Sequence, residues 1–191
     1  MSDCPPAPIR NPAYASPVRV AISACLLGAQ VRYDGGHKHN PLLSGLWARD
    51  VLYFPFCPES ECGLGIPREP MHLVGTAEQP RICTRYSSID HSHRLRLWCR
   101  HRLRTHQAAG VAGYLLKSRS PSCGMTQVTV WSEQEQQHHP ALGILPGLLR
   151  AHHPHLPLAE GDLFTQAESL RHFVKIAREG NTPGVALTGS L

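Results

Sequence analysis

The chain has 191 residues, 41% of them hydrophobic, so it can bury one α/β core without help from disulfide bonds. Its 19 basic and 14 acidic residues give a net charge of +5, which is smaller than the excess of a dedicated nucleic-acid-binding protein. The sequence contains no apolar run of about 18 residues and no secretory signal pattern, which excludes a membrane-spanning helix and favours a cytoplasmic protein.

The first 17 residues contain five prolines and predict an irregular arm. We expect a single domain over residues 18–191. The β-rich run VRVAISA, residues 18–24, predicts a strand that ends at Cys25 and leads into the turn-rich sequence YDGGHKHNP. The chain therefore places a cysteine where a strand meets a loop.

The same arrangement follows further along. Asn40 as N-cap and Pro41 in the first turn predict a helix over residues 40–50, followed by a strand over 51–56 that stops at Cys57. Residues 63–70 are expected to form a loop, and residues 71–85 a hairpin or an irregular excursion.

A third strand precedes a third cysteine. The run from Asp90, a good N-cap, to Gly110 predicts an amphipathic helix with a basic outer face, and residues 111–116 predict a strand leading into SRSPSCG. Beyond it we expect a polar stretch over residues 131–140. A helix over 142–152, a short strand at 156–158 and a last helix over 163–178 then complete the chain.

Alternating strands and helices predict an α/β fold: one domain with a mainly parallel, Rossmann-like sheet flanked by helices. Ligands of such sheets bind in the crevice outside the carboxyl ends of the strands. Because Cys25, Cys57 and Cys123 all lie at or just beyond such ends, we expect them to converge at one edge. The shared position, rather than any single cysteine, argues against simple burial.

Three convergent thiolates are typical ligands of soft metals: zinc, copper(I) or an iron–sulfur cluster. A fourth ligand would come from Cys62, His37 or His39, or the position would stay open for substrate, as in catalytic metal sites. Cys83 and Cys99 are interpreted as buried core residues, and Cys4 as a free thiol of the arm.

Polar groups suited to catalysis surround the cysteines. Glu59 follows Cys57 by two residues and is placed to move protons, although a solvated or capping carboxylate is an equally good interpretation. Ser118, Ser120 and Ser122 offer hydroxyls in the third loop. Three cationic side chains could bind an anion: Arg68, Lys117 and Arg119. The pair Arg32 and Asp34 could hold a polar ligand.

Three sequence blocks resemble signature motifs of the thiouracil desulfidase family, formerly a bacterial domain of unknown function: SACLLGAQVRYDGGHKHNPLL, CPESECGLGIPREP and LLKSRSPSCG. The resemblance implies a [4Fe-4S] cluster held by Cys25, Cys57 and Cys123, with one iron open. It also implies Glu59 as the acid–base group and a serine of KSRSPS in the active site, with Ser120 favoured over Ser118. Cys62 departs from the family pattern.

The implied activity is a non-redox hydrolytic desulfuration of a thiolated pyrimidine, releasing sulfide. The substrate is a free thiobase, a nucleoside or a thiouridine within tRNA; the sequence does not choose among them, and it does not determine the oligomeric state. Two alternatives stay open. One is a structural zinc module that uses Cys62 as fourth ligand and touches RNA through the basic helix. The other is a metal-free thiol enzyme with Cys123 as nucleophile.

Overall fold

The protein is described here from a computed structural model, which covers residues 16–45, 50–134 and 136–180. The arm up to residue 15, including Cys4, lies outside the described residues. The elements follow in chain order: β1 (Val18–Ser23), η1 (Ala24–Leu27), α1 (Pro41–Ser44), β2 (Val51–Phe56), α2 (Pro58–Glu61), β3 (Met71–Gly75), β4 (Pro80–Thr84), α3 (Ser92–Ala108), β5 (Gly113–Leu116), β6 (Thr129–Ser132), β7 (Gln137–Pro140), α4 (Ile144–His152), β8 (Leu158–Glu160), η3 (Gly161–Leu163) and α5 (Ala167–Gly180).

Four parallel strands form the central sheet, in the order β2-β1-β5-β8. Strand β1 pairs with β2 along its whole length, from Val18 opposite Val51 to Ser23 opposite Phe56. All four strands therefore end at one edge of the sheet. This arrangement confirms the predicted α/β fold with a mainly parallel sheet.

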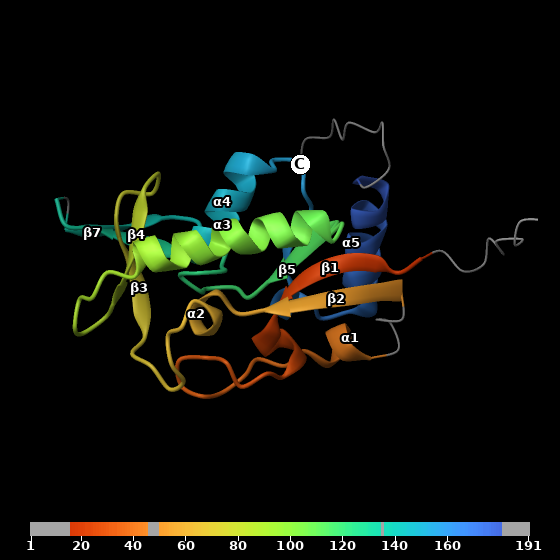
Figure 1. Ribbon diagram of the computed structural model, residues 1–191, viewed down its shortest axis with the longest axis horizontal. Helices are drawn as coiled ribbons and strands as arrows, with labels where there is room; N and C mark the ends of the chain where they lie inside the picture. The colour runs from red at the N-terminus through yellow and green to blue at the C-terminus, as the bar shows by residue number, and fades with distance from the viewer. Residues whose placement is uncertain (1–15, 46–49, 135, 181–191) are drawn as a thin grey trace, which may run out of the picture.

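Helices cover both faces of this sheet (Figure 1). Alternate residues of β1 point to opposite faces, as the pleat of a strand requires, so Ala21 joins the core under α3 and α4 while Val20 and Ile22 join the core under α1 and α5. Leu115 of β5 packs on the α5 side, and Tyr114 and Leu116 pack on the other. Burial on both faces explains why these strands read as continuous apolar runs.

A second, mixed sheet lies at one end of the molecule's long axis, in the order β4-β3-β6-β7 (Figure 1). Its β3–β4 hairpin confirms one of the two forms expected for residues 71–85. The sheet itself was not predicted. Strand β6, which begins two residues before the stretch interpreted only as polar, pairs antiparallel with β7 inside that stretch, and β3 pairs in parallel with β6. That last pairing joins distant segments and leaves no local sequence signal.

Several boundaries differ from the expected ones. Helix α3 begins at Ser92 with His91 as its N-cap, one residue later than the predicted N-cap Asp90. Asp90 forms an isolated bridge with Cys83, and its carboxylate accepts the Ser92 backbone N–H at 2.7 Å. Helix α1 ends at Ser44; its N-cap is Asn40, as predicted, and residues 46–49 of the longer predicted helix lie outside the described residues. Strand β8 is shifted to 158–160 by its parallel register with β5.

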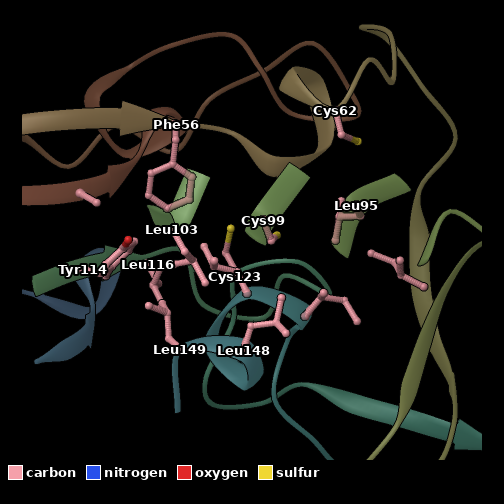
Figure 2. Packing of buried hydrophobic residues seen from close by; sticks show 14 of the residues in the cluster. Phe56, Cys62, Leu95, Cys99, Leu103, Tyr114, Leu116, Cys123, Leu148 and Leu149 are labelled. Atoms are coloured by element: carbon pink, nitrogen blue, oxygen red, sulfur yellow. The ribbon is translucent and has the colours of Figure 1, made fainter. Parts of the chain in front are cut away.

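The larger core joins the two sheets beneath α3 and α4 (Figure 2). Within it, His106 of α3 is only 3% exposed. Its Nδ1 lies 2.9 Å from the Tyr114 hydroxyl, and its ring contacts Phe54 and Phe56 edge to face. Burial lowers the pKa of His106 from 6.5 to about 4, and the charge of Arg102 adds to the decrease.

We therefore expect the stability of the fold to decrease in acid because of His106. Between pH 6.5 and about 4 the unfolded chain binds a proton at His106 that the folded chain does not. This contribution to stability is complete above pH 6.5 and is lost as pH falls toward the folded pKa, by about 1.4 kcal/mol per pH unit. Urea unfolding at a series of pH values measures the slope. His106→Gln, which keeps a partner for Tyr114, is expected to remove this component, and an unchanged slope would contradict the assignment.

Among the described residues, no helix is both long and apolar enough to cross a membrane.

Candidate functional site

A cavity of about 440 Å³ opens at the carboxyl edge of the parallel sheet. Its walls come from the segments that follow β1, β2 and β5, as the rule for parallel sheets predicts. The cavity is lined by Ser23, Ala24, Cys25, Val31, Arg32, Tyr33, Lys38, Phe56, Cys57, Pro58, Glu59, Arg68, Pro70, Met71, Lys117, Ser118, Arg119, Ser120, Pro121 and Cys123. All six residues predicted for the site are among them.

The three predicted cysteines share this cavity, and each comes from a different loop. Cys25 lies in η1, Cys57 is the N-cap of α2, and Cys123 follows β5. Burial raises the pKa of the Cys25 thiol to about 11, and neighbouring Cys57 adds to the increase. Burial and then Cys57 also raise the pKa of Cys123. A positive ligand among these thiols would stabilise their charged forms.

Local hydrogen bonds hold each cysteine in place. The Cys25 carbonyl accepts the Lys38 N–H at 2.9 Å, which folds the first loop back on η1. Pro58 starts α2 immediately after Cys57, and the Glu61 carboxylate accepts the Cys57 N–H at 2.8 Å. The Glu61 carboxylate is in turn paired with Arg102 of α3.

In the third loop, the Ser120 hydroxyl oxygen accepts the backbone N–H of Ser122 at 3.2 Å and of Cys123 at 3.1 Å. This serine turn directs Cys123 back toward the sheet. Gly124 follows because nothing larger fits: a Cβ there would lie 2.8 Å from the Ser120 nitrogen.

Glu59 of α2 lies in the cavity wall with both carboxylate oxygens engaged. Arg68 donates to Oε2 from Nε at 2.9 Å and from Nη2 at 2.7 Å, and the buried Ser122 hydroxyl donates to Oε1 at 2.8 Å. A carboxylate oxygen accepts about two hydrogen bonds, so Oε1 keeps one acceptor position. Glu59 is thus a held carboxylate rather than a solvated charge.

Ser118 is bound differently from Ser120. Its hydroxyl donates to Asp162 Oδ2 at 2.6 Å and accepts from Lys117 Nζ at 3.2 Å, while Lys117 Nζ also donates to Asp162 at 2.8 Å. Hydrogen bonds from Lys117 and Ser118 lower the pKa of Asp162 against its desolvation. The single hydroxyl hydrogen of Ser118 is therefore already used.

Asp162, which binds two residues of the cavity wall, was missed by sequence reasoning. It lies in η3, directly after the fourth parallel strand β8, where the rule applied to the cysteines would have placed it. The strand expected at 156–158 ended too early to give this signal.

The cavity wall carries more positive than negative charge. Five cationic side chains line it, and Glu59 is its one carboxylate among the described residues. Arg32 pairs with Asp34, Arg68 with Glu59 and Lys117 with Asp162. In the part of the chain that is described, Lys38 and Arg119 have no carboxylate partner. The wall therefore favours an anionic ligand.

Cys62 does not join the three cavity cysteines. Its Sγ donates to the Glu59 carbonyl at 3.3 Å, and its side chain packs in the core beside Leu95 and Cys99 of α3 (Figure 2). Cys83 and Cys99 are buried, as interpreted from the sequence. Over residues 16–45, 50–134 and 136–180, no three His, Cys, Asp or Glu side chains are arranged to hold a single metal ion.

The basic face of α3 is largely used inside the molecule. Arg94 donates to the Gly63 carbonyl at 3.0 Å, Arg96 donates to the Pro80 carbonyl at 2.7 Å, and Arg102 pairs with Glu61. These contacts attach α3 to the second cysteine loop and to β4. Three of the five arginines of the helix are therefore already bound to groups within the protein.

Comparison with known proteins found two matches. The family described as 2-thiouracil desulfurase matches residues 20–161. A solved structure of TudS, a [4Fe-4S]-dependent thiouracil desulfidase, is 29% identical to the chain and superposes with a TM-score of 0.63, covering 81% of this chain and 98% of that one. No curated protein is significantly similar to the chain.

Proposed function

Because the chain belongs to the 2-thiouracil desulfurase family, we propose that it is a [4Fe-4S]-dependent desulfidase that replaces the sulfur of a thiolated pyrimidine with oxygen. The observation that carries the proposal is the convergence of Cys25, Cys57 and Cys123 in one cavity, beside a held carboxylate. The substrate class is a free thiouracil or a thiouridine-type nucleoside.

The donor set fits an iron–sulfur cluster. Such clusters are bound by cysteine thiolates, and three thiolates leave one metal without a protein ligand, as catalytic metal sites require. A cluster bound by three thiolates carries a net negative charge, which suits the cationic wall that Arg32, Lys38 and Lys117 help to form. The Lys117 and Arg32 charges act on Cys25 in the required direction, since both lower the pKa of its thiol.

When bound, the cluster supplies a Lewis-acidic iron for the thiocarbonyl sulfur, which makes the ring carbon more electrophilic. The protein supplies the remaining steps. A water bound at the open acceptor position of Glu59 Oε1 is oriented toward that carbon, and the Glu59 carboxylate takes a proton from the water as it attacks. The carbon–oxygen bond forms, the carbon–sulfur bond breaks, and sulfur leaves as hydrogen sulfide. Water supplies both the oxygen and the two protons, so no electrons are transferred.

Ser120 is the serine we assign to the substrate. Its oxygen accepts two backbone N–H groups, and among the described residues nothing accepts its hydroxyl hydrogen. That hydrogen is free to donate to a ring carbonyl or nitrogen in the cavity. Ser118 has no such hydrogen to offer, because Asp162 accepts it. We therefore give Ser118 the role of holding Lys117 and Asp162 in place.

The position of Cys62 does not support the alternative of a structural zinc module, since its side chain packs against α3 rather than in the cavity. The metal-free thiol enzyme is equally unsupported. Burial raises the pKa of Cys123, which disfavours its nucleophilic form, and no histidine lines the cavity among the described residues.

An anaerobic preparation tests the proposal directly. We expect a brown protein with about four iron ions and about four sulfides per chain. It should convert 2- or 4-thiouracil to uracil with one sulfide released per turnover, without an added reductant. Thiouridine and thiolated tRNA, assayed in parallel, identify the substrate within the class. A colourless protein containing one zinc ion, or an iron-loaded protein that leaves every thiolated pyrimidine intact, would refute the function.

A further inference from the structure

The Arg68 guanidinium connects two of the three cysteine-bearing loops. Its Nη2 donates to the Val31 carbonyl of the first loop at 3.0 Å, and its Nε and Nη2 both donate to Glu59 of the second loop. The backbone N–H of Arg68 also donates to the Tyr33 carbonyl at 2.8 Å. With its side chain only 9% exposed, this arginine is part of the cavity wall rather than of the surface.

Glu59 extends the connection to the third loop. While Arg68 holds Oε2, the Ser122 hydroxyl donates to Oε1, and Ser122 itself is fully buried beside Cys123. The chain of contacts runs from Val31 through Arg68 and Glu59 to Ser122. It links all three segments that carry the cavity cysteines.

The geometry of the Arg68–Glu59 pair restricts the carboxylate more than a single ion pair would. Two donors from one planar guanidinium on Oε2, and a third donor on Oε1, leave the carboxylate little freedom to rotate. The remaining acceptor position of Oε1 is thereby fixed in direction. A lysine could supply the charge at this position but not two donors in a fixed plane.

We propose that Arg68 is a positioning residue that acts through Glu59, an inference that rests on the proposed function. Arg68 fixes the direction from which the attacking water approaches the thiocarbonyl carbon. Its assigned role is to hold the carboxylate rather than to bind the substrate. Misplacement of a catalytic group by about 1 Å can cost about 100-fold in rate, so the role is measurable.

The test compares Arg68→Ala and Arg68→Lys with the wild-type enzyme, with kcat expressed per bound cluster from the iron content and visible spectrum. We expect Arg68→Ala to lower kcat by about 100-fold with little change in KM. Added guanidinium ions should restore part of the activity of Arg68→Ala, but ammonium ions should not. Arg68→Lys should retain the cluster yet remain slow. Arg94→Ala is the matched control, because Arg94 donates to Gly63 of the same loop without reaching Glu59.

A double variant separates positioning from general structural support. If Arg68 acts through Glu59, then Arg68→Ala should slow Glu59→Gln no further, because the base that Arg68 positions is already absent from that variant. An equal additional loss in the Glu59→Gln background would overturn the inference. A wild-type kcat per cluster in Arg68→Ala would also overturn it. So would an Arg68→Lys preparation in which few molecules hold a cluster but each bound cluster turns over at the wild-type rate. Failure of the wild-type enzyme to desulfurate would instead refute the proposed function.

Discussion

Alanine at Cys25, Cys57 or Cys123 is expected to abolish cluster binding and desulfuration together. The three thiols come from three different loops of one cavity. Among the described residues, a cluster left with two protein ligands has no replacement thiol there, since Cys62 packs against α3. Each variant should be colourless after anaerobic purification, with iron near background. Visible absorption and iron analysis measure the loss, and sulfide release from thiouracil measures the activity.

Cys62→Ala and Cys99→Ala are the matched controls, because both residues are buried thiols outside the cavity wall. Both should retain the brown colour and turnover, at a cost of about 1 kcal/mol in stability. If Cys62→Ala lost its iron and Cys57→Ala kept it, the ligand from the second loop would be Cys62 and our assignment of Cys57 would be wrong. Circular dichroism of each variant separates loss of the cluster from loss of the fold.

Glu59→Gln is expected to lower kcat by about 10²–10⁴-fold while the cluster stays bound. The amide keeps the shape of the carboxylate and can still accept from Arg68, so the loop should hold its position. It cannot take a proton from water, and the attack on the thiocarbonyl carbon loses its base. Single-turnover assays with thiouracil, normalised to iron content, measure the effect.

Glu168→Gln serves as the control for Glu59→Gln, because this exposed glutamate of α5 pairs with Arg171 of its own helix and does not line the cavity. It should leave turnover unchanged. If Glu59→Gln turned over at the wild-type rate, Glu59 would be reduced to a link between loops, and another group would have to activate the water. If the variant lost its cluster, the carboxylate would be needed for assembly rather than for proton transfer.

The second sheet and several boundaries were missed for one physical reason. Strands β1 and β2 are runs of β-branched and aromatic residues, so their positions follow from local preference, and the expected and observed ranges nearly coincide. The β3–β6 pairing and the register of β8 depend on contacts between residues far apart in the chain. Asp90 has a good capping side chain, yet its bridge to Cys83 decides where α3 begins.

The candidate site divides in the same way. The gathering of the three cysteines was predictable, because parallel strands end at one edge and each cysteine follows a strand end in the sequence. The partners of Glu59 and Ser118 were not predictable. Arg68 is nine residues from Glu59, Ser122 is 63 residues away, and Asp162 lies 44 residues beyond Ser118.

By itself, the sequence determined the fold class, the edge of the sheet that carries the chemistry, and the residues at the ends of β1, β2 and β5, because these depend on local periodicity and on the symmetry of parallel strands. Only the tertiary structure decided which polar groups touch. It placed Cys62 against α3, used the Ser118 hydrogen on Asp162 and, within the described part of the chain, left the Ser120 hydrogen without an acceptor. Hydrogen bonds depend on differences of a few tenths of an ångström between loops, which no pattern in the chain records.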